Sequence, residues 1–396
     1  MTIGEAQPEK RAVITGVGMS RIGRRTGIPG LELTLEAVRA AIADAGLTPA
    51  DIDGMATLGD TPLTQTAAAL GIDAHDCGGA FDSGGLLAPV MSACVAIAER
   101  RARHVLVYRT VQMMGGALIP SGQPPSGEPA AEPAFDRKRA RAVMGDMEPL
   151  LAYHAYSAAN WLAMHCRRHM YLYGTTKEQL GWLAIATREH AARNPDAIFR
   201  DRMTMDDYLA ARPVSTPFGL FDCDIPVDGS IAFVVSSEEY ADSCPSQPVR
   251  VEAMGGAPGT GGWIHRPDFP RMAAVDAAAQ MWGRTDLGPG DVDIAQLYDG
   301  FTFITLSWLE ALGLCAEGES GHFVEGGTRI ALDGELPLNT YGGQLSAGRM
   351  HGYWVLHEAC VQLRGAGGAR QVPRQPEVAV VSNGGGPIAG CMLLTR

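Results

Sequence analysis

Two short segments of this 396-residue chain place tyrosine, aspartate, arginine and histidine beside glycines. The first runs from Gln296 to Thr302 and reads Gln-Leu-Tyr-Asp-Gly-Phe-Thr; the second runs from Leu338 to Gly352. Glycine costs fold stability, so a segment that combines it with proton-exchanging side chains more often marks a ligand site than a core. The candidates for proton transfer are Tyr298, Asp299, Tyr341, Arg349 and His351.

These side chains suit acid-base chemistry without a covalent intermediate. A phenol with a pKa near 10 is a poor base at pH 7, so Tyr298 would need a neighbouring cation, and Arg349 is always charged. The alternatives are structural: Tyr298 could be a packed aromatic residue, and Arg349 could simply neutralise Asp299. A third segment, Asn383-Gly-Gly-Gly386, offers backbone N–H groups that glycine allows close to a ligand oxygen.

Composition limits the class of protein. With 46% hydrophobic residues the chain can bury one large core or two packed halves. A net charge of -12 argues against nonspecific binding to nucleic acid or to anionic membranes, because phosphate binding needs a basic surface. No apolar run reaches about 18 residues and the first residues are polar, so a soluble, cytoplasmic protein is expected. The eight cysteines form no CxxC pair, which is typical of reduced thiols.

Three other patterns are weak. His165-x-x-x-His169 has the spacing of a metal pair but no identifiable third ligand, so no metal is expected. The basic run at 137–141 suits the phosphates of CoA, although such runs are more often solvated faces. Gly16-Val-Gly18 alone is too little to indicate a dinucleotide site.

One α/β passage occurs twice. A strand at 11–18, a helix with apolar residues at helical spacing over 31–45, the motif Leu47-x-Pro-x-Asp-x-Asp53 and a strand at 54–57 form the first copy. The second copy has strands at 249–251 and 294–298, the motif Leu287-x-Pro-x-Asp-x-Asp293, and a helix whose expected apolar face is Met272, Val275, Ala279 and Trp282.

This repeat predicts two similar α/β halves, residues 1–247 and 248–396. Continuous apolar strands at 231–235 and 378–381 belong in sheets that are covered on both faces. Residues 117–225 are interpreted as an excursion from the first half that forms loops over the site, with helices near 154–172 and 177–193. Further helices are expected from 84 to about 99 and over 352–364.

The chain resembles the thiolase superfamily. Asn339-x-x-Gly-Gly343 before a helix, and Ser382-Asn-Gly-Gly-Gly386 after the penultimate strand, carry the resemblance. Tyr173-Gly-Thr-Thr-Lys-Glu-Gln-Leu180, Asn194-Pro195, Asp222-Cys223 and Asp228-Gly229 are similar to its sterol-carrier, or lipid-transfer, branch. The resemblance implies the thiolase fold, an α/β architecture of two similar halves with central mixed sheets in layered helix and sheet packing.

The residues that thiolases use are replaced. Phe81 stands where the family has its nucleophilic cysteine, Arg349 replaces the histidine of a Gly-His pair, and Ser382 replaces a cysteine. Phenylalanine cannot form an acyl-enzyme. A displaced nucleophile, Cys77 or Ser83, would keep an acyltransferase activity, and a noncatalytic lipid-transfer or partner subunit is a further alternative.

Within the branch, the chain resembles the steroid side-chain-cleaving aldolases. Leu297-Tyr-Asp-Gly-Phe-Thr302, Gly342-Gly-Gln-Leu345 and His351-Gly352 match their motifs. In those enzymes the tyrosine matching Tyr298 is catalytic, and a second tyrosine stands at the position of Arg349. The resemblance implies retro-aldol cleavage of a bulky, steroid-derived β-hydroxyacyl-CoA by a carbon-carbon lyase.

The same resemblance implies partners. No bound cofactor is expected, since CoA is part of the substrate, and a homodimer is expected. A small OB-fold, zinc-ribbon protein would complete a heterotetramer. The candidates for contacts with the acyl-CoA are Asn383, Gly384, Gly385, Gly386, Gly342 and Gly343.

Overall fold

The computed structural model describes residues 7–58, 61–78, 84–114, 150, 152–258 and 262–396. Its strands form a nine-stranded sheet in the order β3-β2-β4-β7-β1-β8-β11-β10-β9. In chain order they are β1 (Ala12–Met19), β2 (Gly54–Thr57), β3 (His75–Asp76), β4 (His104–Gln112), β7 (Asp228–Ser237), β8 (Val249–Pro258), β9 (Ile294–Gln296), β10 (Val378–Gly384) and β11 (Ile388–Thr395).

The two ends of this sheet have the same plan. β1 pairs antiparallel with β7, β7 antiparallel with β4, and β4 parallel with β2. Likewise β8 pairs antiparallel with β11, β11 antiparallel with β10, and β10 parallel with β9. The β1–β8 pair joins the two ends through Val13 opposite Arg250 and Ile14 opposite Val249. The predicted fold class of two similar α/β halves is therefore confirmed, while the boundary at 247/248 stays a prediction.

Glycines bring one helix of each half against its strand. α1 (Gly30–Asp44) packs on β1, where a Cβ at Gly18 would overlap the carbonyl oxygen of Ala37. α9 (Ala274–Trp282) packs on β8, where a Cβ at Gly255 would overlap the carbonyl oxygen of Ala277. Gly18 thus has a packing role, because only a glycine lets the helix backbone approach this closely.

Of the apolar face predicted for α9, Met272 is buried and Trp282 is partly buried against the same core, whereas the prediction for Ala279 was wrong. The structure buries Ala274, Ala277, Ala278 and Met281, whereas Ala279 is exposed. A face of small residues is needed for the close approach at Gly255, and large side chains at helical spacing did not reveal it.

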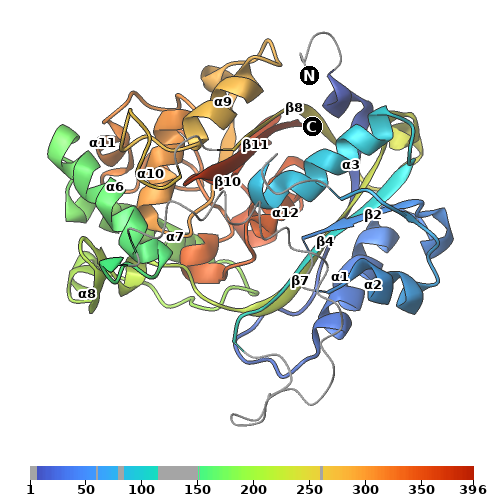
Figure 1. Ribbon diagram of the computed structural model, residues 1–396, viewed down its shortest axis with the longest axis horizontal. Helices are drawn as coiled ribbons and strands as arrows, with labels where there is room; N and C mark the ends of the chain where they lie inside the picture. The colour runs from blue at the N-terminus through green and yellow to red at the C-terminus, as the bar shows by residue number, and fades with distance from the viewer. Residues whose placement is uncertain (1–6, 59–60, 79–83, 115–149, 151, 259–261) are drawn as a thin grey trace.

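Helices cover both faces of the sheet, and two helices run through the middle of the molecule (Figure 1). The central pair, α3 (Ala88–Ala98) and α12 (Tyr353–Leu363), shares a core with one set of alternating strand residues from both halves. α1 and α2 (Leu63–Leu70) cover the outer face of the first half. α9 and α10 (Thr302–Ala311) cover the outer face of the second half. The expected helices at 84–99 and 352–364 correspond to α3, after a short 3-10 turn, and α12.

The described part of the excursion lies beside the C-terminal half (Figure 1). It contains α6 (Ala158–Tyr173), α7 (Lys177–Ala191), α8 (Met205–Leu209) and the hairpin of β5 (Pro213–Ser215) and β6 (Phe218–Gly219). α6 and α7 confirm the two helices predicted there, and a short α11 (Ser320–Val324) contacts α7. The basic run at 137–141 lies outside the described residues.

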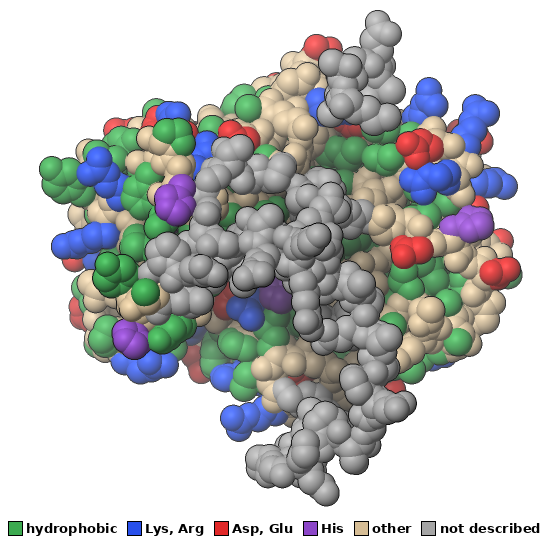
Figure 2. All heavy atoms as spheres, viewed as in Figure 1, with side chains coloured by type: hydrophobic (Ala, Val, Ile, Leu, Met, Phe, Trp, Pro, Cys, Tyr) green, Lys and Arg blue, Asp and Glu red, His purple; other side chains and the backbone are tan. Residues whose placement is uncertain are grey.

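Charges of both signs are interspersed on the face shown in Figure 2, where Lys and Arg side chains lie in small groups beside acidic ones. Within the described residues, no helix is both long and apolar enough to cross a membrane.

Candidate active site

Three chain segments meet at the ends of the central strands. The loop after β9 and the loop before α12 were expected together, and the structure adds a third segment between them, Cys223–Ile225. The Asp224 N–H donates to the Gly300 carbonyl at 3.1 Å, the Ile225 N–H to the Gln344 carbonyl at 3.0 Å, and the Arg349 N–H to the Ile225 carbonyl at 2.8 Å. The third segment therefore holds the two predicted segments in register.

Asp222 anchors this third segment to the excursion. Its buried carboxylate accepts hydrogen bonds from the Tyr208 hydroxyl at 2.5 Å, the Gly219 N–H at 2.7 Å and the Thr302 hydroxyl at 2.8 Å. It also pairs with the ammonium group of Lys177. These partners come from α7, α8, the β5–β6 hairpin and the first residue of α10, so one side chain fixes four elements.

Asp299 is fully buried, and its carboxylate is hydrogen-bonded to the backbone. Its carboxylate accepts the Gln344 N–H at 2.9 Å and the Leu345 N–H at 3.4 Å. Burial raises its pKa to about 7, although these two amide bonds act in the opposite direction. Asp299 was predicted as a catalytic residue, and the structure places it as the cap of the turn Gly343–Ala347.

Tyr298 lies at the centre of the meeting point. Its N–H donates to the Ser382 hydroxyl at 3.0 Å, and its ring is partly exposed. Burial and then the charge of Asp224 raise the pKa of its phenol, and the opposing effects of Arg349 and Gln344 do not overcome them. Arg349 was expected to make this phenol a base, but the raised pKa keeps Tyr298 protonated at neutral pH.

Arg349 pairs with Asp224, not with Asp299. Its guanidinium lies 3.3 and 3.4 Å from the two carboxylate oxygens of Asp224, and its Nε lies 3.0 Å from the sulfur of Met113. Burial raises the pKa of Asp224 to about 6, and Arg349 holds it from rising further. Sequence reasoning missed Asp224, although it directly follows Asp222-Cys223, a pair that carried the family resemblance.

His351 is held by a residue of the other half. The Arg109 guanidinium, on β4, lies 2.9 Å from its Nδ1. The backbone at His351 has a φ of 49°, and its carbonyl accepts a hydrogen bond from the Asn383 amide at 2.9 Å. Burial and then the charges of Arg109 and Arg349 keep the pKa of His351 well below its ordinary value, so its ring is neutral at physiological pH.

Tyr341, the second phenol predicted to take part, is a core residue. It is fully buried, and its ring stacks on Trp354 with centroids 5.1 Å apart. Its carbonyl accepts the Asn194 amide at 2.9 Å, while its hydroxyl has no hydrogen-bond partner within the described residues. Burial, and then the charges of Asp299, Glu358 and Tyr298, raise the pKa of its phenol, so Tyr341 lies within electrostatic reach of Tyr298.

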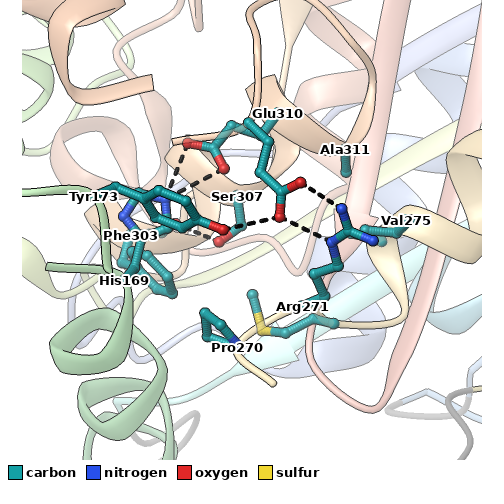
Figure 3. Close-up of a pocket in the computed structure, with 12 residues that line it drawn as sticks. His169, Tyr173, Pro270, Arg271, Val275, Phe303, Ser307, Glu310 and Ala311 are labelled. Atoms are coloured by element: carbon teal, nitrogen blue, oxygen red, sulfur yellow. Dashed lines mark hydrogen bonds and ion pairs between the residues drawn. The ribbon is translucent and has the colours of Figure 1, made fainter. Parts of the chain in front are cut away.

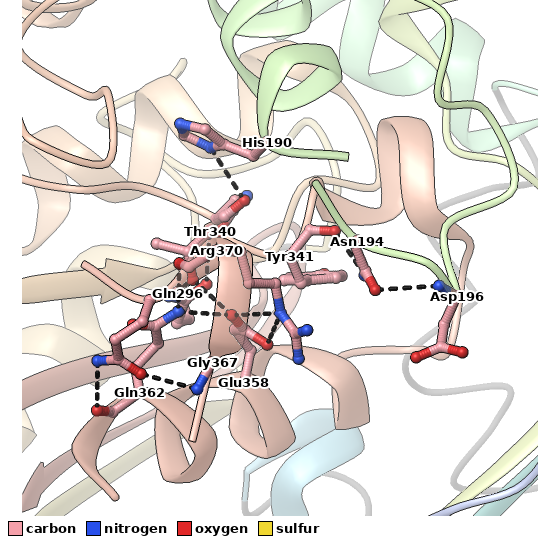
Figure 4. Close-up of polar contacts among 12 residues, drawn as sticks. His190, Asn194, Asp196, Gln296, Thr340, Tyr341, Glu358, Gln362, Gly367 and Arg370 are labelled. Carbon is pink, nitrogen blue, oxygen red and sulfur yellow. Dashed lines mark hydrogen bonds and ion pairs between the residues drawn. The ribbon is translucent and has the colours of Figure 1, made fainter. Parts of the chain in front are cut away.

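A buried polar network ties the two predicted segments to α12 (Figure 4). The Gln296 amide donates to the Thr340 hydroxyl at 2.9 Å, and that hydroxyl donates to Glu358 at 2.7 Å. Glu358 also accepts the Gln362 amide at 2.9 Å and pairs with Arg370 at 3.0 Å. Since Gln296 and Thr340 lie two and one residues before Tyr298 and Tyr341, the network positions the backbone of the site.

In the glycine turn predicted to contact the acyl-CoA, most backbone groups are hydrogen-bonded within the β10–β11 hairpin. Asn383 and Gly384 pair with β11, and the Gly385 N–H donates to the Ile388 carbonyl at 3.1 Å. Within the described residues, the Gly386 N–H has no hydrogen-bond acceptor, and it remains the amide of this turn that suits a ligand oxygen.

Gly342 and Gly343, the other glycines predicted to contact the acyl-CoA, are required by the packing and backbone conformation at their positions. At Gly342 (φ 105°) a side chain would overlap Ala191, and at Gly343 (φ 64°) it would overlap the carboxylate of Asp299. Both positions also have positive φ, which favours glycine.

The thiols are poor nucleophiles. Burial raises the pKa of all eight cysteines, with Cys94, Cys223, Cys315 and Cys360 at about 12. Cys77 is 2% exposed, and burial is the main cause of its raised pKa. A thiolate is the reactive form, so Cys77 does not suit the role of a displaced nucleophile. Phe81 and Ser83 lie outside the described residues.

A separate pocket of about 140 Å³ lies between α6 and α10 (Figure 3). His169 contacts Glu310 at 3.0 Å, Tyr173 donates to Glu317 at 3.0 Å, and Arg271 pairs with Glu317. These polar groups form hydrogen bonds and ion pairs with one another, so we interpret the pocket as a structural feature and not as a ligand site.

The histidine pair considered for metal binding is likewise engaged by protein groups. The two ring nitrogens of His165 lie 2.9 and 2.6 Å from the carbonyl oxygens of Pro270 and Trp263, and His169 contacts Glu310. The part of the chain that the structure describes holds no group of three or more metal-binding side chains.

Comparisons with known proteins agree with this arrangement. Residues 259–394 match the family described as Thiolase C-terminal domain-like. A 17-hydroxy-3-oxo-4-pregnene-20-carboxyl-CoA lyase of Mycobacterium tuberculosis is 34% identical over 97% of this chain and 99% of its own length. A steroid side-chain-cleaving aldolase of Thermomonospora curvata is 33% identical over 96% of this chain and 97% of its own.

A solved structure gives the same result. An Ltp2-ChsH2(DUF35) aldolase superposes with a TM-score of 0.86 at 31% identity, covering 99% of both chains. The predicted fold and family resemblance are thereby confirmed. The chain belongs to the thiolase superfamily, in the group of the steroid side-chain-cleaving aldolases, and is a carbon-carbon lyase.

Proposed function

We propose that this enzyme cleaves a bulky, steroid-derived β-hydroxyacyl-CoA by a retro-aldol reaction into a ketone and a shorter acyl-CoA. The observation that carries the proposal is the grouping of a protonated phenol, Tyr298, with an ion pair, Asp224 and Arg349. The cysteines, all with raised pKa, favour a reaction that needs no covalent intermediate.

The reaction balances without a co-reactant. A base takes the proton of the β-hydroxyl, the bond between the α and β carbons breaks, and the β carbon leaves as a ketone. The electron pair passes into the thioester as an enolate, and the α carbon then takes up a proton. One proton is removed and one is returned, so the products contain all the atoms of the substrate.

The site can supply both proton steps. Asp224, with a pKa of about 6, is mostly ionised at pH 7 and accepts the hydroxyl proton. Tyr298 gives its proton to the α carbon and recovers one from Asp224, which returns the enzyme to its starting state. Arg349 keeps Asp224 ionised in a buried setting.

The acyl-CoA would lie along the glycine segments. The Gly386 N–H, and further groups of the turn from Asn383, are proposed to bind the thioester oxygen, where negative charge develops. CoA enters as part of the substrate in this proposal, and no resident cofactor is needed.

The proposal is tested by incubating the pure protein with β-hydroxyacyl-CoAs that carry a steroid ring system. Appearance of a ketone with an equal amount of a shorter acyl-CoA is expected. A covalent acyl-protein in place of these products would favour the acyltransferase alternative, and ligand binding without turnover would favour the noncatalytic alternative.

We further propose an assembly in which this chain forms a homodimer and binds a small OB-fold, zinc-ribbon protein. The name of the solved aldolase, which has two components, supports a partner subunit. Light scattering of the chain alone and with a candidate partner tests it, and an active monomer in solution would reject it.

A further inference from the structure

Resting on the proposed function, we infer that Arg109 holds His351 as a neutral imidazole with its proton on Nε2, so that His351 donates a hydrogen bond to the thioester oxygen. His351 is then an electrophilic catalyst that stabilises the enolate, and Arg109 is a positioning residue. Neither role is that of a base.

The geometry dictates the tautomer. A guanidinium has five N–H donors and no acceptor, so the 2.9 Å contact between Arg109 Nη2 and His351 Nδ1 requires a lone pair on Nδ1. A neutral imidazole with a lone pair on Nδ1 carries its hydrogen on Nε2. Within the described residues Nε2 has no hydrogen-bond partner in the protein, so this donor is available to a ligand.

The surroundings support the same state. The charged groups that act on the ring are Arg109 from β4 and Arg349 from its own segment, and both disfavour an imidazolium. Asp224, a carboxylate of the same site, is engaged by Arg349. His351 also hydrogen-bonds through its carbonyl to Asn383, which directly precedes the glycine turn proposed to bind the thioester.

Arg109 is well placed to act over the whole reaction. It is 7% exposed and lies in the middle of β4, a strand paired on both edges with β2 and β7. A guanidinium stays charged at all relevant pH values, so the tautomer that it selects does not change as protons move at Tyr298 and Asp224.

The direct test is nitrogen-15 NMR of the full chain with labelled histidine, with the His351 signals assigned by their loss in His351→Gln. We expect the shifts of a neutral Nε2–H tautomer throughout the range from about pH 5 to about pH 8. In Arg109→Met, His351 should populate both neutral tautomers, and its pKa should rise because one of the two charges that lower it is lost. A wild-type His351 that carries its proton on Nδ1, or that titrates near pH 6.5, overturns the inference regardless of any enzyme activity.

The donor role has its own readout, exchange of the α protons of acetyl-CoA with deuterated water, which needs enolate formation but no steroid. His351→Gln keeps an amide donor near the position of Nε2, whereas His351→Asn places its amide near Nδ1. We expect the Asn variant to exchange at least about tenfold more slowly than the Gln variant. Equal rates in the two variants would reject the donor role even if cleavage of the steroid substrate is observed.

Arg109→Met should lower the exchange rate by a similar factor and move the acidic limb of its pH profile upward, because one of the two charges that lower the pKa of His351 is lost. Arg109→Lys should restore part of the rate. Arg103→Met, which removes an exposed arginine next to the same strand, is the matched control and should leave the rate and its pH profile unchanged. An Arg109→Met profile that is lower but identical in shape would indicate a structural role only and would contradict the inference.

Discussion

The two halves of the sheet share their strand order and the close contact between a glycine and a helix carbonyl, yet they differ in the residues that follow the matching strands β2 and β9. Five residues after Asp53 stands Leu58, and five residues after Asp293 stands Tyr298. The loop after β9 carries Tyr298 and Asp299, and the loop before α12 carries Arg349 and His351. The comparison teaches that packing determines what the halves share, while Tyr298, Arg349 and His351 lie in connections of the second half. Asp224 and Arg109 reach them from the first half.

The largest expected effect is that of Tyr298→Phe, which keeps the ring and removes the proton donor. Cleavage should fall by about 10²- to 10⁴-fold, while the melting temperature changes little, because at most about 1 kcal/mol of hydrogen bonding is lost. Steady-state kinetics and thermal unfolding measure the two quantities. Leu58→Ala, the matching residue of the first half, is the control and should keep most of the activity per folded molecule. A Tyr298→Phe enzyme with near wild-type turnover would end the proposed mechanism.

Next in size is Asp224→Asn, which keeps the shape of the side chain and removes the base. The rate should fall by about 10²-fold. The wild-type kcat/KM should decline as the pH falls below about 6, since Asp224 accepts a proton only when ionised and its pKa in the fold is raised to about 6. The variant should lack this acidic limb. An unchanged limb in Asp224→Asn would assign the titration to another group.

Two matched glycine substitutions test the shared packing. Gly18→Ala and Gly255→Ala should each lower the free energy of unfolding by about 1–3 kcal/mol, because the new Cβ meets a helix carbonyl in both halves. Gly290→Ala, which meets no atom within 4 Å, is the control. Denaturant titration measures all three. If only one of the two halves is sensitive, the packing of the halves is less alike than the strand order indicates.

The smallest effects on activity are expected for substitutions of residues that have no role in the proposed reaction. Cys77→Ala should keep most of the activity, because burial raises the pKa of this thiol and no covalent step is proposed. Tyr341→Phe should also leave turnover nearly unchanged, since its hydroxyl is buried and has no hydrogen-bond partner within the described residues. A loss above about a hundredfold in a folded Cys77→Ala protein would restore a thiol mechanism.

Much of the fold could be predicted from the sequence because its signals are local. The repeated motif at 47–53 and 287–293 forms the same 3-10 turn in both halves, Pro49–Asp51 and Pro289–Asp291. Helical periodicity located α6, α7 and α12 to within a few residues. It missed the alanine positions of α9 that approach Gly255 of β8.

The site was less predictable because its parts come from distant positions. The segments around Tyr298 and Arg349 were found from their composition, but Asp224 and Arg109 lie far from both in sequence. Charge alone also paired Arg349 with Asp299, the nearest carboxylate in the motif. In the structure Asp299 accepts hydrogen bonds from backbone amides, and Arg349 pairs with Asp224 instead. Only the tertiary arrangement reveals these partners.

Asp222 and Asp224 are two residues apart, and one anchors the outer helices while the other belongs to the reacting groups. The excursion and the site are therefore parts of one cooperative unit. Local unfolding that releases α7 or α8 from Asp222 would displace Asp224 as well, even if the nine-stranded sheet remained intact. We therefore expect activity on heating to be lost together with the hydrogen-exchange protection of α7, and before that of the central strands.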